Sequence, residues 1–88
     1  MTAPQTPRLM LYGRAWCHLC EEMQVALEPL LAEFDMPVEV VDIDTDAELE
    51  ARYDELVPVL VWDGQELCRY RLDAAHVRAV LESYRASR

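Results

Sequence analysis

Two cysteines three residues apart stand where a strand-forming segment gives way to a helix-forming one. The short apolar run 8–12 ends at Gly13 and suits a buried strand. From Cys17 to Phe34, apolar residues recur at the spacing of one helix face, and Cys20 lies one turn into that helix. A chain of 88 residues has room for one modest core, so this strand–loop–helix junction must be part of it.

The rest of the chain also alternates between strand and helix patterns. The further expected elements are a strand over 37–43, a short helix after the capping-box pattern Thr45–Glu48, strands over 57–62 and 66–71 joined by the turn Asp63-Gly64, and a helix capped by Asp73. The order is β-α-β-α-β-β-α. Because a helix connects the first two strands, we expect them to be parallel, whereas the last two form an antiparallel hairpin. This pattern predicts one α/β domain.

The N-terminal segment differs from the rest. Residues 1–7 are polar and include two prolines, so we predict a disordered arm there and a single domain over 8–88. The segment lacks the basic start and apolar stretch of a signal peptide. No run approaches the roughly 20 apolar residues that a membrane-spanning helix needs. We therefore expect a cytoplasmic protein without a membrane partner.

The charge of the chain is strongly acidic. The formal net charge is -9, and all basic residues are arginines. An acidic surface repels phosphate backbones, so nucleic acid is not an expected partner. We expect a monomer.

The three cysteines do not suit a disulfide scaffold, which would need an even set. A pair spaced as Cys17 and Cys20 also occurs as half of a zinc site, but the sequence holds no second such pair. The other candidate ligands are Cys68, His18 and His76. Because the pair follows the first strand of a strand–helix–strand unit, we interpret it as a redox dithiol and predict no metal site. Cys68 lies within a strand and is predicted to be a buried thiol.

The two cysteines of the pair differ in their expected surroundings. At the start of the helix, unpaired amides and the helix dipole favour the thiolate form of Cys17, which makes it the expected nucleophile. Cys20 is less exposed and is the expected resolving thiol. His18 would stabilise the thiolate if it were protonated, and otherwise it simply faces solvent.

Two further positions are candidates for substrate contacts. The Val57-Pro58 bond can be cis at tolerable cost, which would leave the backbone of Val57 free to pair with a peptide-like substrate. A trans proline at the start of an edge strand is also compatible with these residues, so the sequence pattern alone does not decide between a cis and a trans bond. Trp16, directly before Cys17, is expected to pack over the cysteine pair and to contact substrates.

Together these motifs resemble the thioredoxin superfamily, and most closely its short glutaredoxin-like group. The residues that carry the resemblance are Trp16-Cys17-His18-Leu19-Cys20 after a strand, Val57-Pro58-Val59 some forty residues later, and the Asp63-Gly64 turn. The resemblance runs from about residue 8 to residue 84. It implies a thioredoxin fold of glutaredoxin type, with a four-stranded mixed sheet and helices on both faces. It also implies that Pro58 is cis and stands opposite Cys17.

The resemblance also implies roles for single residues. Cys17 would attack and Cys20 would resolve, so that the two form a redox-active disulfide. The backbone of Val57 would pair with the cysteine of glutathione. Arg14 would meet a glutathione carboxylate, and Asp73 would meet the amino group in addition to capping its helix. Glutaredoxins usually carry a glycine pair just before that acidic residue, and this chain has none there.

The predicted function is that of a thiol-disulfide oxidoreductase with a part in cell redox homeostasis. It would reduce protein or glutathione mixed disulfides without a covalently bound cofactor, with glutathione as a candidate reductant or co-substrate. Disulfide-containing proteins and glutathione are the expected partners. One alternative is glutathione-assisted binding of an iron–sulfur cluster or a thiophilic metal. A further one is a redox-sensing module whose disulfide changes a partner interface.

Overall fold

The computed structural model describes residues 9–87 and contains one four-stranded sheet and three α-helices within them. In chain order the elements are β1 (Leu9–Gly13), α1 (His18–Phe34), β2 (Val38–Asp42), the short 3-10 helix η1 (Ile43–Thr45), α2 (Ala47–Tyr53), β3 (Val59–Trp62), β4 (Gln65–Arg69) and α3 (Ala74–Ser87). This order confirms the predicted β-α-β-α-β-β-α arrangement. The arm predicted over 1–7 lies outside the described residues.

The strands lie in the order β2-β1-β3-β4. β1 pairs with β2 in parallel and with β3 in antiparallel orientation, and β3 pairs with β4 in antiparallel orientation, so the sheet is mixed, as expected. The hairpin between β3 and β4 turns at Asp63 and Gly64, both of which have positive φ (51° and 85°). Two residues of positive φ form the tight turn that matches the twist of paired strands, which is why Asp-Gly was an informative signal.

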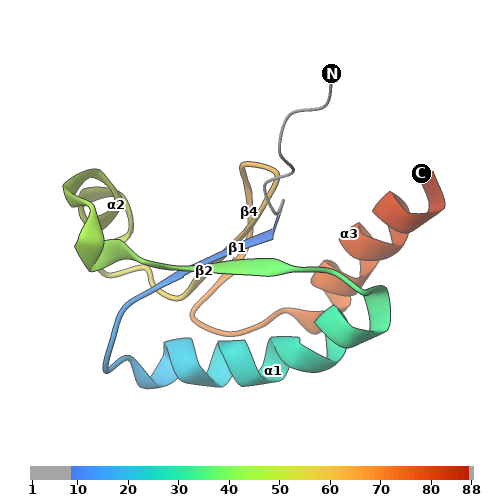
Figure 1. The fold of residues 1–88 in the computed structure, drawn as a ribbon, viewed down its shortest axis with the longest axis horizontal. Coiled ribbons are helices and arrows are strands. Elements are labelled where there is room, and N and C mark those ends of the chain that lie inside the picture. The colour runs from blue at the N-terminus through green and yellow to red at the C-terminus, as the bar shows by residue number, and fades with distance from the viewer. Residues whose placement is uncertain (1–8, 88) are drawn as a thin grey trace.

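Helices cover both faces of the sheet (Figure 1). One face packs against α1 and α3 and forms the main core; its buried residues are Leu9, Leu11, Met23, Leu27, Leu30, Phe34, Leu60, Val77 and Leu81. Tyr12 alternates with Leu11 along β1 and so points to the other face, where its ring stacks on Tyr53 of α2 at 4.6 Å between centroids. α2 therefore lies across the sheet from α1.

Helix α1 contributes buried residues to the core and contains Cys20, the second cysteine of the pair. Its buried residues recur every three or four positions from Cys20 to Phe34, as the sequence pattern predicted. Asp35 ends the helix in the left-handed conformation (φ 50°), with the Met36 amide donating to the Leu31 carbonyl at 2.9 Å. Among residues 9–87, no helix combines the length and the apolar character that crossing a membrane requires.

The predicted start of α2 is wrong by one residue. The N-cap of α2 is Asp46, whose carboxylate accepts a hydrogen bond from the Glu48 amide at 2.8 Å. The predicted cap, Thr45, instead donates its hydroxyl to the Asp42 carbonyl at 2.7 Å. Because that hydroxyl already serves η1, it is not available to the first turn of α2.

The last strand also ends earlier than predicted, at Arg69 instead of residue 71. The physical reason is that Tyr70 takes a positive φ of 68°, which breaks the extended backbone. Its amide donates to the Pro58 carbonyl at 2.8 Å, so the end of β4 is tied to the start of β3.

Candidate active site

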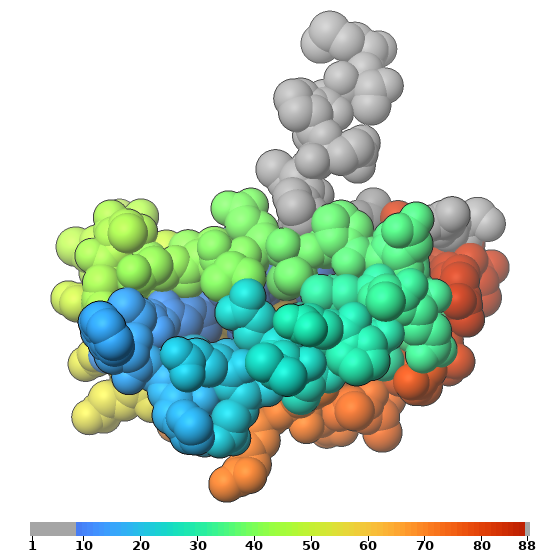
Figure 2. Space-filling model, turned by 60° about the horizontal axis from the view of Figure 1, so that its bottom comes forward, coloured from blue at the N-terminus to red at the C-terminus, as the bar shows by residue number. Residues whose placement is uncertain are grey.

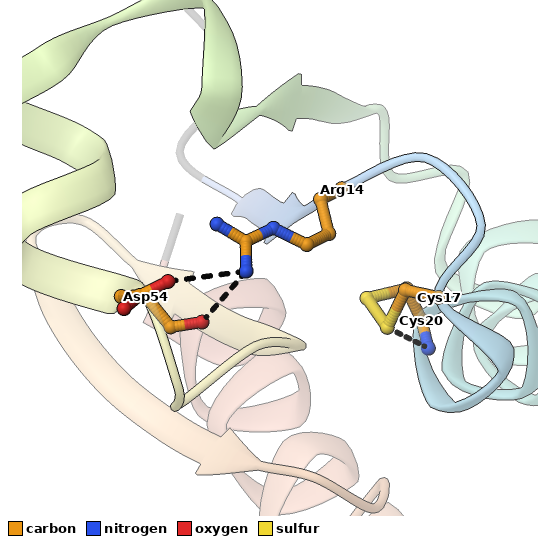
Figure 3. The surroundings of a disulfide bond; sticks show 4 residues. All are labelled: Arg14, Cys17, Cys20 and Asp54. Carbon is orange, nitrogen blue, oxygen red and sulfur yellow. Dashed lines mark hydrogen bonds and ion pairs between the residues drawn. A yellow bond between two sulfur atoms is a disulfide. The ribbon is translucent and has the colours of Figure 1, made fainter.

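A disulfide joins Cys17 to Cys20 at the beginning of α1 (Figure 3). Cys17 is the N-cap residue of the helix, with extended backbone, and its Sγ accepts a hydrogen bond from the Cys20 amide at 3.1 Å. That amide is one of the donors a helix start leaves unpaired, so in the reduced protein it stabilises negative charge on the Cys17 sulfur. Cys17 is partly exposed and Cys20 is buried, so an incoming disulfide reaches Cys17 first.

Gly13, the last residue of β1, makes room for the buried sulfur. A Cβ atom built at Gly13 would lie 3.1 Å from the Cys20 Sγ and 3.3 Å from its Cβ. Any side chain there would press on Cys20. In the sequence Gly13 marks only the end of a strand, because close packing against a residue seven positions later is not visible in a pattern of propensities.

The Val57-Pro58 peptide bond is cis, as the resemblance implied. Tyr12 pairs with Val59, so the antiparallel register brings Pro58 alongside Gly13, at the sheet end where the loop to Cys17 begins. Within residues 9–87, no backbone hydrogen bond is formed to Val57. The backbone of Val57 therefore has donor and acceptor capacity free at the same end of the sheet as the disulfide.

Trp16 does not pack over the cysteine pair as expected, because it is 99% exposed. Its backbone has φ 63°, the left-handed region that is strained for a bulky residue. This conformation turns the indole away from the core and into solvent directly beside Cys17. The predicted contact of Trp16 with substrates stays a prediction, and full exposure leaves the ring available for it.

Arg14 turns away from the disulfide toward Asp54, the residue that ends α2 (Figure 3). Its guanidinium lies 3.1 Å from a carboxylate oxygen of Asp54, 3.0 Å from one of Asp44 and 4.0 Å from one of Glu50. The hydrogen bond with Asp54 is the main cause that raises the pKa of Arg14 above its usual value. The predicted contact with glutathione stays a prediction, in which the glutathione carboxylate would compete with these three.

His18 and Asp73 take positions at the first turns of two helices. His18 is exposed, and its Nε2 lies 2.8 Å from a Glu22 carboxylate oxygen one helical turn along. Asp73 accepts a hydrogen bond from the His76 amide at 3.1 Å, which confirms its role as a helix cap. The stabilisation of the Cys17 thiolate by His18 and the contact of Asp73 with glutathione stay predictions, as does any contact of His18 with a substrate.

Cys68 is half-buried in β4, close to its predicted description as a buried thiol. Burial is the main cause that raises the pKa of its thiol. A hydrogen bond with the Asp73 backbone opposes this rise, and the negative charges of Asp73 and Glu66 add to it. Among residues 9–87, no three His, Cys, Asp or Glu side chains are grouped so that they could hold a metal ion.

These surroundings predict an order of thiol reactivity. In the reduced protein near pH 7, iodoacetamide should alkylate Cys17 about tenfold or more faster than Cys68, because the helix-start amide favours one thiolate while burial disfavours the other. Since the pKa of Cys68 is raised, its rate should climb only as the pH rises further. Mass spectrometry of timed samples at pH 7 and pH 9 measures both rates. Equal labelling at pH 7 in the folded protein would contradict the prediction, and urea-unfolded protein provides the reference.

Comparison with known families gives one clear match. The family model described as Glutaredoxin-like domain (DUF836) matches residues 8–82. A search of curated proteins gives no match.

Solved structures match along most of the chain. Protein Ne2328 from Nitrosomonas europaea is 40% identical, with a TM-score of 0.73, and the match covers 91% of this chain and 98% of that one. Protein XcR50 from X. campestris is 39% identical, with a TM-score of 0.65 and coverage of 85% and 96%. Thioredoxin 1 from Thermosipho africanus, at 19% identity, has a TM-score of 0.62 and coverage of 90% and 94%, and shows the fold alone. The mixed sheet with its three helices is thus a thioredoxin fold.

Proposed function

Because this chain belongs to the glutaredoxin-like family of the thioredoxin superfamily, we propose that it is a thiol-disulfide oxidoreductase that reduces mixed disulfides of proteins or glutathione. The observation that supports this most strongly is the Cys17–Cys20 disulfide at the beginning of α1, in which the Cys17 Sγ accepts a hydrogen bond from the Cys20 amide. That arrangement favours a thiolate at the reachable sulfur and keeps a second thiol within bonding distance. We place the activity in a cytoplasmic monomer.

The proposed reaction has two exchange steps. The Cys17 thiolate attacks one sulfur of the substrate disulfide, forms a mixed disulfide, and releases the other substrate sulfur as a thiolate that takes up a proton. Cys20, after losing its proton to water, attacks the Cys17 Sγ and releases the second substrate thiolate. Two electrons pass to the substrate, and Cys17 and Cys20 end as a disulfide. A thiol reductant, either two glutathione molecules or a dithiol protein, then reduces this disulfide.

The surroundings of the disulfide favour protein substrates. The free backbone groups of Val57 can pair with an extended substrate segment beside the attacked sulfur. The turn before Asp73, where glutaredoxins usually carry glycines, here holds Tyr70 in the left-handed conformation with its side chain exposed. The side chain of Tyr70 occupies part of the volume that a glycine pair would leave free for glutathione.

The test is a pair of coupled assays on purified protein. One follows reduction of insulin with dithiothreitol as reductant, and the other follows reduction of a small glutathione mixed disulfide with glutathione. We expect the wild type to accelerate at least the insulin reaction, and Cys17→Ser to be inactive in both. Equal rates for wild type and Cys17→Ser would overturn the proposal, whereas activity confined to the dithiothreitol assay would identify a dithiol as the reductant.

Glutathione-assisted binding of an iron–sulfur cluster through Cys17 is the alternative function. It predicts visible absorption and acid-labile sulfide after anaerobic reconstitution with iron, sulfide and glutathione.

A further inference from the structure

A cleft of about 310 Å³ opens beside the buried cysteine, on the face of the sheet that α1 covers. Figure 2 shows the hollow between the green atoms of β2 and the blue to cyan atoms of α1, with the blue atoms of β1 at its floor. Its apolar lining comes from three elements and the loop before α1, and includes Leu11, Gly13, Trp16, Cys20, Val40 and Val41. The cleft thus reaches the disulfide from the side of β2, away from β3 and its cis proline.

The register of the sheet explains why this cleft exists. β2 is an edge strand, and its Val38 and Val40 pair with Leu9 and Leu11, so all four face α1. Val38 packs against the main core, but Val40 is 52% exposed. Gly13 lines the cleft two residues further along, where it pairs with Asp42 and leaves its side-chain space to Cys20. The result is an open apolar cleft beside Cys20, with Val40 exposed on its β2 side.

The rim of the cleft is acidic. Glu21 from α1 and Asp42 from the end of β2 line it, and among residues 9–87 neither carboxylate forms an ion pair. Arg14 also lines the cleft, but its guanidinium already faces Asp44 and Asp54. One Asp42 carboxylate oxygen accepts a hydrogen bond from the Asp44 amide at 2.9 Å, as the cap of η1. An occupant that buries apolar surface here therefore meets negative charge at the rim that no cation of residues 9–87 pairs with.

We propose that this cleft selects substrates: it receives an apolar side chain that lies next to the attacked cysteine of a substrate protein and is followed by a lysine or arginine. The inference rests on the proposed function and names its substrate class. The apolar side chain packs on Val40, the exposed Trp16 ring closes over it, and the cation lies against Glu21 and Asp42. The exchange steps are those given above, with Cys17 attacking the substrate sulfur.

Charge also disfavours other small occupants of the cleft. Glutathione carries two carboxylates and one ammonium group at neutral pH, so its net negative charge is repelled by the acidic rim. A peptide that carries a cation gains attraction from the same two carboxylates. The cleft is therefore distinct in its chemistry from a site built for glutathione.

The first experiment maps binding without catalysis. A cysteine-free peptide with a Leu-Lys pair is titrated into ¹⁵N-labelled oxidised protein, with matched Ser-Lys and Leu-Glu peptides as controls. We expect amide shifts at Gly13, Val40 and Asp42 that weaken with either control peptide. Shifts absent from these residues, or confined to the turn at residues 70–72, would overturn the inference whatever the activity of the protein.

The second experiment compares two exposed valines. We measure kcat/KM for a Leu-Lys peptide disulfide and for a small disulfide, and divide the first value by the second. In Val40→Ser this ratio should fall about tenfold, which is the usual effect of losing an apolar contact in a pocket. Val25→Ser, on α1 outside the cleft and 64% exposed, should leave the ratio unchanged. Asp42→Asn should reduce the preference for Leu-Lys over Leu-Glu peptides.

The outcomes of the two proposals can be told apart. If Cys17-dependent reduction of the small disulfide is present but the Val40→Ser ratio equals that of Val25→Ser, the cleft does not select substrates and the inference fails while the function stands. If no disulfide is reduced, the proposed function fails, and the peptide titration still decides whether the cleft binds such a segment.

Discussion

Cys17→Ser abolishes disulfide turnover, and Cys20→Ser stops it at the mixed disulfide; these are the results we expect from the largest change that can be made to the site. A serine hydroxyl is not ionised near neutral pH and cannot displace a thiolate, so the rate should fall by about 10³-fold or more. In Cys20→Ser the Cys17 sulfur keeps its position at the helix start, and it still attacks the substrate disulfide. The second exchange does not, so the substrate stays attached.

Mass spectrometry of the stalled reaction distinguishes these steps. Cys20→Ser incubated with a peptide disulfide should accumulate an adduct with half of the peptide on Cys17. Cys68→Ser is the matched control: its thiol is half-buried with a raised pKa, and its loss should leave turnover unchanged. An adduct that forms on Cys68, or turnover that survives in Cys17→Ser, would contradict the assigned order of attack.

Gly13→Val has the second largest expected effect, because the end of β1 and the start of α1 are in contact there. A Cβ alone would lie 3.1 Å from the Cys20 sulfur, and the branched valine adds two methyl groups beyond it. Such overpacking lowers the free energy of unfolding by about 1–3 kcal/mol. Displacing Cys20 should also slow the second exchange step, and the mixed disulfide should persist longer. Urea unfolding of the reduced protein and rapid quenching of the reaction measure the two effects.

Gly13→Ala serves as the graded control for this prediction. Its single methyl group needs the Cys20 side chain to yield by only a few tenths of an ångström, so its losses should be clearly smaller than those of the valine variant. If the valine variant is as stable as the wild type and resolves at the same rate, Cys20 is not confined by β1 as described.

Much of the fold could be predicted because its signals are local. The cysteine pair at the strand–helix junction, the helical spacing of the α1 core and the Asp63-Gly64 turn each act within a few residues, and each lies where the pattern placed it. The cis state of Pro58 could be inferred only from the family resemblance, since a proline at the start of a strand is compatible with either isomer.

The start of α2 was missed although its signals are local, because the Asp42 carbonyl takes the Thr45 hydroxyl and leaves Asp46 to cap the helix. The parts of the site that were missed depend on contacts between segments far apart in the sequence. The direction of Arg14 is set by carboxylates 30 to 40 residues away in sequence. The cleft exists because a parallel register exposes one valine at the sheet edge, and no pattern along the chain reveals that register.

The left-handed backbone of Trp16 has a consequence for motion. A side chain in that conformation costs about 1–2 kcal/mol that glycine would avoid, so stability is given up to hold an aromatic ring in water beside the reacting sulfur. With 99% of its surface exposed, the ring turns freely about its own side-chain bonds, and only its point of attachment is fixed by the backbone. A docked partner therefore sets the orientation of the indole, while the left-handed backbone keeps that ring one residue from the reacting sulfur.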